Sequence, residues 1–108
     1  MEKSSFTLVF GSSPFIKILD FFLTFEDLDY PISFIAKETK TKWETTNKVI
    51  ETLIKKNIIK KTRKLGKSQL YTLNKESKLT ELLKDVDLKI SRFFIEKELE
   101  GQKIKITS

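Results

Sequence analysis

Lysine and arginine side chains are concentrated between residues 37 and 67 of this 108-residue chain. This segment holds eleven Lys and Arg against three Glu, a net charge of +8, whereas the whole chain carries only +6. Ammonium and guanidinium groups bind phosphate oxygens, and a basic patch of this kind attracts polyanions. The segment therefore predicts a surface that binds a nucleic-acid duplex.

The chain contains no cysteine and no histidine, which excludes several kinds of chemistry. It has no disulfide, no thiolate or imidazole ligand for zinc, and no histidine to relay protons. Its carboxylates lack the loop spacing of a Ca²⁺ or Mg²⁺ site, and no nucleophile or phosphate-binding loop is recognisable. We therefore expect no metal and no cofactor, and an enzyme is the least favoured class. A small-molecule effector stays open and unidentified.

Length and composition are those of one globular domain. Hydrophobic residues make up 39% of the chain and charged residues 33%, which is too apolar for a disordered chain. The longest apolar run is far shorter than the roughly 20 residues of a membrane span. The apolar stretch near the N-terminus is too short for a signal peptide. We expect a cytoplasmic location and no membrane partner.

Three segments show apolar residues at the three- and four-residue spacing of a helix face. The pattern predicts helices over residues 14–25, 34–40 and 43–56, with Ser13 and Ser33 as caps of the first two. A short helix, a tight turn and a second helix make a helix-turn-helix. The inward row of the third helix is expected to be Thr46, Val49, Ile50, Leu53 and Ile54.

Two strand-like runs follow the third helix, at residues 58–63 and 68–73. Gly66 lies between them at a position suited to positive φ. Asn57 is expected to end the third helix in a left-handed conformation. The runs predict a two-stranded hairpin, which turns the helix-turn-helix into a winged helix.

A long helical pattern covers residues 75–100, with Asn74 or Ser77 as its cap. Its apolar stripe spans about five turns, more than a small core can cover, which is typical of a partner surface. We expect a two-fold homodimer that presents two basic surfaces to half-sites about 10 base pairs apart, or a multiple of that. The residues expected at this interface are Leu79, Leu82, Leu83, Val86, Ile90, Phe93 and Phe94.

The expected fold class is α+β and mostly helical: a winged helix-turn-helix with a two-stranded wing and a long C-terminal helix. Residues 5–10 are expected to form a short strand or an extended arm, and the tail after Gly101 a short strand or a disordered segment. Segments 5–10 and 103–107 could pair as edge strands across the dimer. The expected organisation is an arm at 1–12, a winged helix-turn-helix at 13–74, a dimerisation helix at 75–100 and a tail at 101–108.

The third helix and the hairpin are the elements that would contact a duplex. A helix enters the major groove when one face packs on the domain and the other is polar, with its N-terminal residues nearest the bases. Asn47 could form two hydrogen bonds with adenine, and Lys48 could reach guanine or a phosphate. Basic side chains at the hairpin could follow the backbone or enter a minor groove. The residues expected to bind DNA are Lys42, Trp43, Thr45, Asn47, Lys48, Arg63, Lys64 and Lys67.

Some side chains near this surface allow two interpretations. Trp43 lies beside the packed row of its helix, so it could pack on the domain or contact DNA at the rim. Glu44 and Glu51 face outward and would repel phosphates, unless one accepts a hydrogen bond from cytosine. An aromatic excess in the first and last helices could line a ligand pocket or pack those helices together. Its members are Phe21, Phe22, Phe25, Phe93 and Phe94.

Three segments resemble archaeal winged-helix transcriptional regulators, which are broadly similar to the MarR- and ArsR-type superfamily. They are residues 33–38 (SFIAKE), 42–59 and 70–74 (LYTLN), and the resemblance covers about two-thirds of the chain. It implies a winged-helix fold and a sequence-specific regulator of transcription that binds double-stranded DNA, with repression by occlusion. Lys40 and Lys42 stand where glycine and a capping Ser or Thr are usual, which predicts an irregular turn. An ArsR-type metal sensor would need thiolates or imidazoles, and the chain has neither.

Two other functions compete with this one. A winged helix can be a protein-interaction module in replication, plasmid partition or transcription-complex assembly, with the wing or third helix binding protein. A single-strand or RNA binder would need exposed aromatic side chains on the basic face, and only Trp43 is available there. Duplex binding with a steep salt dependence would separate the first function from these alternatives.

Overall fold

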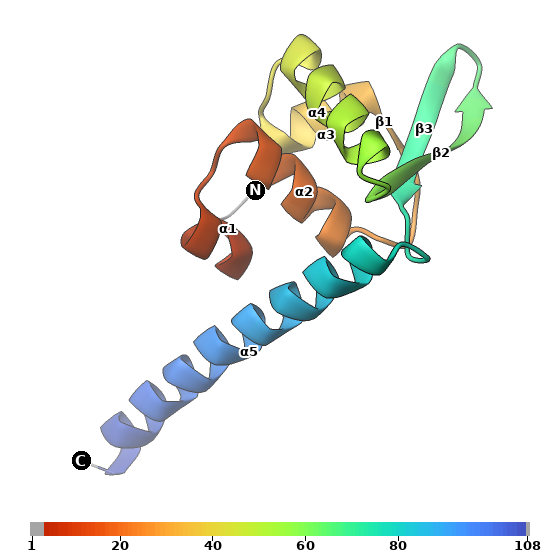
Figure 1. Ribbon diagram of the computed structural model, residues 1–108. Coiled ribbons are helices and arrows are strands. Elements are labelled where there is room, and N and C mark those ends of the chain that lie inside the picture. The colour runs from red at the N-terminus through yellow and green to blue at the C-terminus, as the bar shows by residue number, and fades with distance from the viewer. Residues whose placement is uncertain (1–3, 108) are drawn as a thin grey trace.

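The computed structural model describes residues 4–107, with side chains up to residue 101, so the first three residues of the expected arm and the last of the tail lie outside it. A helix-turn-helix and a projecting hairpin lie at one end, and a long helix extends away from them (Figure 1). The predicted fold class, a mostly helical winged helix-turn-helix, is confirmed. The elements are α1 (Ser5–Phe10), α2 (Pro14–Thr24), β1 (Tyr30–Pro31), α3 (Ile32–Thr39), α4 (Trp43–Lys55), β2 (Ile59–Leu65), β3 (Ser68–Leu73) and α5 (Lys78–Thr107).

Helix α2 is the centre of the core. Ser13 caps it as predicted, by accepting a hydrogen bond from a backbone N–H in its first turn. Residues 18–23 are all buried, so α2 presents no side to solvent over this stretch. A helix buried all round needs neighbours on every side, and α2 contacts α1, α3, α4 and α5. Side chains from α4 and the sheet complete the cluster, among them Leu53, Ile59 and Leu73.

The three strands form one antiparallel sheet in the order β1-β3-β2. Gly66 and Lys67 form the hairpin turn, and Gly66 has a φ of 59°. Asn57 has a φ of 60° just after α4. Both predicted left-handed positions are therefore confirmed. The sequence predicts only an extended segment at β1, which in fact pairs with β3 and adds a third strand beside the two-stranded wing.

Both ends of the chain differ from the sequence predictions. Residues 5–10 form α1 rather than a strand or an extended arm, because Ser4 caps a helical turn and Phe6 packs into the core. Helix α5 continues past Gly101, where it was expected to end. Since both segments are helical, the predicted pairing of 5–10 with 103–107 as edge strands is wrong.

The aromatic side chains of α2 and α5 form two separate groups. Phe21 packs against three rings near the start of α3, those of Phe25, Tyr30 and Phe34. On α5, Phe93 contacts Phe94 edge-on. Helices α2 and α5 are in contact, as predicted, but in the described part of the chain their two aromatic groups do not stack on each other. Helix α5 instead adds Leu83 to the core.

Polar contacts from α5 hold it against the end of α2. Lys84 Nζ donates a hydrogen bond to the Leu23 carbonyl (2.7 Å) and lies 2.6 Å from Glu26 Oε2. Lys75, just before α5, lies 3.6 Å from Glu26 Oε1. The predicted cap Ser77 accepts a long hydrogen bond (3.5 Å) from the Thr80 backbone N–H. The beginning of α5 is therefore fixed to the domain at several points.

The apolar stripe predicted on α5 is largely exposed. Its residues Leu79, Leu82, Val86 and Phe93 are 41–56% exposed, whereas Leu83, Ile90 and Phe94 are half-buried. Helix α1 adds an exposed apolar face beside it, and Val9 lies in one shallow hollow with α5 residues that include Val86 and Phe93. Among the described residues, no helix combines the length and apolarity needed to cross a membrane.

Asp20 places a carboxyl inside the core, on the side of α2 that faces α1 and α5. It is 1% exposed, and Ser4 Oγ donates a hydrogen bond to its Oδ2 (2.8 Å). Its Oδ1 has no hydrogen-bond partner among the described residues. Burial raises the pKa of Asp20; the Ser4 hydrogen bond opposes this rise, and the charge of Asp87 on α5 adds to it. Ionised Asp20 is therefore a cost to the folded state.

Replacing Asp20 by Asn is expected to help the folded state more as the pH rises. A carboxyl with a raised folded pKa adds no penalty below its ordinary value of 3.8; the penalty grows between 3.8 and the raised pKa and is complete above the raised pKa. Urea unfolding should show the free-energy difference between Asp20→Asn and the native chain to be more favourable at about pH 7 than at about pH 3. A difference that is independent of pH would contradict this account.

Candidate nucleic-acid interface

Helix α4 packs one face on the domain and leaves the opposite face in solvent. On the outer face Glu44, Lys48 and Glu51 are exposed, whereas Thr45 and Asn47 are half-buried. A helix with this division of faces can place its polar face in the groove of a duplex while its apolar face stays packed on the domain. The predicted inward row is confirmed, with four residues at most 9% exposed and one packed at the core's edge: Thr46, Val49, Ile50, Leu53 and Ile54.

Three threonine hydroxyls fix the turn between α3 and α4. Thr39 Oγ1 donates to the Ile35 carbonyl (2.7 Å), and Thr46 Oγ1 donates to the Lys42 carbonyl (2.8 Å). Thr41 lies between them, its Oγ1 2.8 Å from that of Thr39 and 2.6 Å from that of Thr46. Three hydroxyl protons therefore serve four contacts, so Thr41 donates to one neighbour at a time. This threonine chain ties the end of α3 to the start of α4.

Lys40 turns the backbone between the two helices in a left-handed conformation (φ 55°, ψ 45°). Its N–H donates to the carbonyls of Ala36 and Lys37, and the Thr41 N–H donates to the Ala36 carbonyl. These bonds close α3 as a Schellman-type motif. The turn is thus a regular helix ending rather than the irregular one predicted, although a lysine there costs about 1 kcal/mol.

Helices α3 and α4 both begin without a side-chain cap from the described residues. Helix α3 starts at Ile32, earlier than predicted, and Pro31 is the residue before it. The prediction that Ser33 caps this helix is therefore wrong, because Ser33 lies inside the first turn, where it is exposed. The open N–H groups and the helix dipoles add positive potential to a basic surface.

Strand β2 carries the basic side chains of the wing, while β3 carries no charged residue. Every residue of β2 after Ile59 is exposed. The strand lies at the edge of the sheet, so its outer backbone N–H and C=O groups face no neighbouring strand among the described residues. The basic residues of β2 are Lys60, Lys61, Arg63 and Lys64.

Asp29 in the loop before β1 holds Arg63. Arg63 Nε lies 3.2 Å from Asp29 Oδ2, and Thr62 donates a hydrogen bond to the same carboxylate. The Thr62 hydroxyl, and after it Arg63, lower the pKa of the Asp29 carboxyl. The contact coincides with a β-bulge between Lys61 and Lys64, which bends the strand. The charge of Arg63 is therefore partly neutralised, unlike that of a free side chain at the wing tip.

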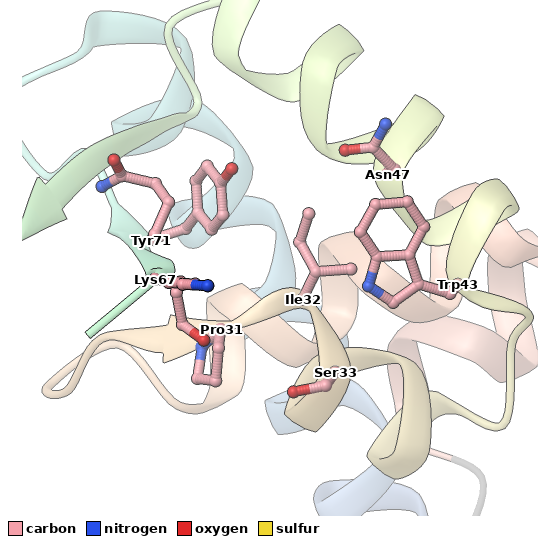
Figure 2. A pocket seen from close by; sticks show the side chains of 9 residues that line it. Pro31, Ile32, Ser33, Trp43, Asn47, Lys67 and Tyr71 are labelled. Carbon is pink, nitrogen blue, oxygen red and sulfur yellow. The ribbon is translucent and has the colours of Figure 1, made fainter. Parts of the chain in front are cut away.

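A hollow of about 390 Å³ lies between α4 and the wing. Trp43 and Tyr71 stand on opposite sides of it, with Ile32 between them (Figure 2). The Lys67 ammonium group and the Trp43 indole nitrogen are directed toward its centre from opposite sides (Figure 2). Burial, with a smaller effect from Glu51, raises the pKa of the Tyr71 phenol. The lining residues are Pro31, Ile32, Ser33, Trp43, Asn47, Lys67, Ser68, Gln69 and Tyr71.

Three residues predicted to bind DNA, Trp43, Asn47 and Lys67, line this one hollow. Trp43 is 52% exposed, so it both borders the hollow and leaves part of its ring accessible. Sequence analysis missed Ser33 and Tyr71, because pairing of β1 with β3 brings the start of α3 beside the wing. A two-residue strand gives no periodicity from which to predict this. The other predicted residues are exposed or half-buried outside the hollow: Lys42, Thr45, Lys48, Arg63 and Lys64.

No protein-family model matches the chain, and no curated protein matches its sequence. Several solved structures are similar. MepR, a transcription regulator of the Staphylococcus aureus multidrug efflux pump MepA, has a TM-score of 0.61 at 17% identity, over 88% of this chain and 74% of MepR. Streptococcus pneumoniae FabT, solved in complex with DNA, has a TM-score of 0.65 at 18% identity, over 85% of this chain and 66% of FabT.

A possible transcriptional regulator from Methanosarcina mazei Go1 is also similar, with a TM-score of 0.54 at 19% identity, over 84% of this chain and 74% of that one. These likenesses show that the chain has the winged-helix fold of such regulators.

Thr46→Val is expected to destabilise the protein by about 1 kcal/mol, because it removes a buried hydroxyl from the threonine chain without changing side-chain size much. Thr52→Val is the matched control on the same helix. Thr52 also donates to a carbonyl four residues earlier, but at an exposed site where water can replace the bond, so its cost should be under half as large. Equal losses in urea unfolding would show that the threonine chain adds nothing beyond an ordinary helix contact.

Proposed function

We propose that this protein is a sequence-specific transcriptional regulator that binds double-stranded DNA and represses by occlusion. Helix α4 would enter the major groove, and the wing would follow the backbone or enter the adjacent minor groove. The observation that carries the proposal is the common face of these two elements. A helix packed on one side and polar on the other lies next to an edge strand whose basic side chains are all exposed.

The likeness to known regulators supports this proposal. FabT was solved in complex with DNA, and MepR is a transcription regulator. At 17–18% identity the fold is shared, whereas the DNA partner and the regulatory role are part of the proposal. The archaeal origin implied by the sequence resemblance stays a prediction, and a cytoplasmic location belongs to the same proposal. The proposed contacts come from Lys42, Trp43, Thr45, Asn47, Lys48, Arg63, Lys64 and Lys67.

We further propose that the active form is a homodimer joined by α1 and α5. The exposed stripe of α5 and the exposed face of α1 lie side by side, and the hollow that they share is lined almost only by apolar side chains. Apolar surface of this extent is uncommon on a monomer. A two-fold axis through α5 would present two copies of α4 to a palindromic site. The α5 residues assigned to this interface are Leu79, Leu82, Leu83, Val86, Ile90, Phe93 and Phe94.

Selection of a binding site from a random duplex library, followed by affinity measurements at several salt concentrations, tests DNA binding. The logarithm of affinity should fall with the logarithm of salt concentration at a slope of roughly −0.9 for each phosphate contact. Asn47→Ala should reduce discrimination against mismatched sites by about tenfold. Lys64→Ala should weaken all duplexes alike and flatten the slope by about one contact, whereas Arg63→Ala should flatten it less because Asp29 already pairs with Arg63.

If the selection yields no bound duplex, or if the affinity for duplexes does not change with salt concentration, the alternative function is favoured. That alternative is a winged-helix protein-interaction module in replication, plasmid partition or transcription-complex assembly. Loss of discrimination in Lys64→Ala but not in Asn47→Ala would contradict the assignment of base contacts to α4.

Phe93→Glu is expected to convert a dimer into a monomer at concentrations of tens of micromolar, because it places a charge in an apolar interface. Arg92→Glu, at an exposed neighbouring residue on α5, is the control and should leave the dimer intact. Analytical ultracentrifugation measures both variants and the native chain. A native chain that sediments as a monomer at these concentrations contradicts the dimer proposal directly.

A further inference from the structure

The hollow between α4 and the wing combines an apolar floor with hydrogen-bond donors at its rim. Ile32 and Pro31 supply aliphatic surface, and the rings of Trp43 and Tyr71 supply the walls. Of the nine lining residues none is acidic, and Lys67 contributes a positive charge. Ser33 contributes a hydroxyl. This combination suits a group that is anionic at one end and apolar at the other.

The polar groups at the rim of the hollow differ in whether they already bind the protein itself. Gln69 directs its amide nitrogen to the carbonyls of Arg63 and Leu70, at 3.2 and 3.1 Å, and so serves the wing itself. The ammonium group of Lys67 and the indole nitrogen of Trp43 instead point into the hollow (Figure 2). They converge on one space from two different elements, α4 and the hairpin turn.

The position of the hollow follows from the proposed function, on which this inference rests. In B-form DNA a single sugar–phosphate strand separates the major groove, about 12 Å wide, from the adjacent minor groove, about 6 Å wide. A protein with α4 in one groove and its wing at the other must straddle that strand. The surface between α4 and the wing is the hollow, so this is where the strand has to lie.

We propose that the hollow is the seat of one sugar–phosphate unit of the strand between the two grooves. Lys67 and Ser33 contact its phosphate, and the Trp43 indole N–H donates to a phosphate oxygen. The deoxyribose packs on Ile32 and the Trp43 ring. Trp43 therefore fixes the register of α4 on the duplex through the backbone and carries no base specificity of its own.

The experiment uses the selected duplex and a series of duplexes in which single phosphates are replaced by neutral methylphosphonates. Neutralising one phosphate in each half-site should weaken the native protein by about tenfold. Lys67→Gln and Trp43→Phe should each lose affinity for the native duplex and lose their sensitivity to that same phosphate. Lys64→Gln, on the same hairpin but outside the hollow, should lose affinity yet keep the sensitivity. The Trp43→Phe variant should discriminate against mismatched sites to the same degree as the native chain.

Trp43 also reports directly, since it is the only tryptophan in the chain. Its emission should change when the selected duplex binds, and the change should shrink with the duplex that carries the methylphosphonate at the identified position. Binding of duplexes with no change in emission, or with the same phosphate sensitivities in native, Lys67→Gln and Trp43→Phe proteins, overturns the seat but leaves the proposed function standing. Absence of binding to any duplex overturns both.

Discussion

The burial of α2 on every side is the constraint on which the rest of the structure depends. Residues 18–23 expose no side to water, so the helix-turn-helix alone cannot cover them. Helices α3 and α4 cover one side, and α1 and the start of α5 cover the other. This is why residues 5–10 fold as a helix and why α5 begins against the domain rather than as a free extension. The position of the proposed DNA-binding surface and that of the apolar stripe are therefore set by the same helix.

Charge is distributed unevenly around this core. Basic side chains gather on β2 and around the turn from α3 to α4, and carboxylates lie near the junction of α2 and α5. Two carboxylates form ion pairs that hold elements in place: Asp29 pairs with Arg63 of the wing, and Glu26 pairs with Lys84 of α5. Glu26 lies away from the proposed DNA interface, whereas Asp29 offsets part of the positive charge of the wing by pairing with Arg63. Glu44 and Glu51 also lower the positive potential there, because they remain exposed on α4.

Much of the fold could be predicted because helical periodicity and single turn residues carry strong local signals. The packed row of α4 and the left-handed Asn57 and Gly66 follow from such signals and are confirmed. The N-terminal helix could not be predicted, because the partial alternation of residues 5–10 suits a strand as well as a helix. Only the burial of Phe6 in the core decides between them. The cap of α3 was misassigned since Ser33 is a good capping residue in general, and only the pairing of β1 starts the helix earlier. For the candidate site, sequence supplied the residues of α4 and the wing but not the hollow they share, which depends on tertiary pairing.

The contacts between Lys84 and the end of α2, which define a clasp at Leu23 and Glu26, affect how α5 can move. Beyond Lys84, α5 continues for about 25 Å to Gly101, and α1 contacts it along the way, with Val9 beside Phe93 and Phe94. A tilt of about 8° at the clasp would carry Gly101 through about 3.5 Å, which is close to the rise of one base pair. In a dimer joined along α5, the helix would act as a lever that turns sub-ångström adjustments around Leu23 and Glu26 into a change of spacing between two DNA-facing surfaces. The contacts of Lys84 with Leu23 and Glu26 would then contribute to the spacing of the two surfaces in such a dimer.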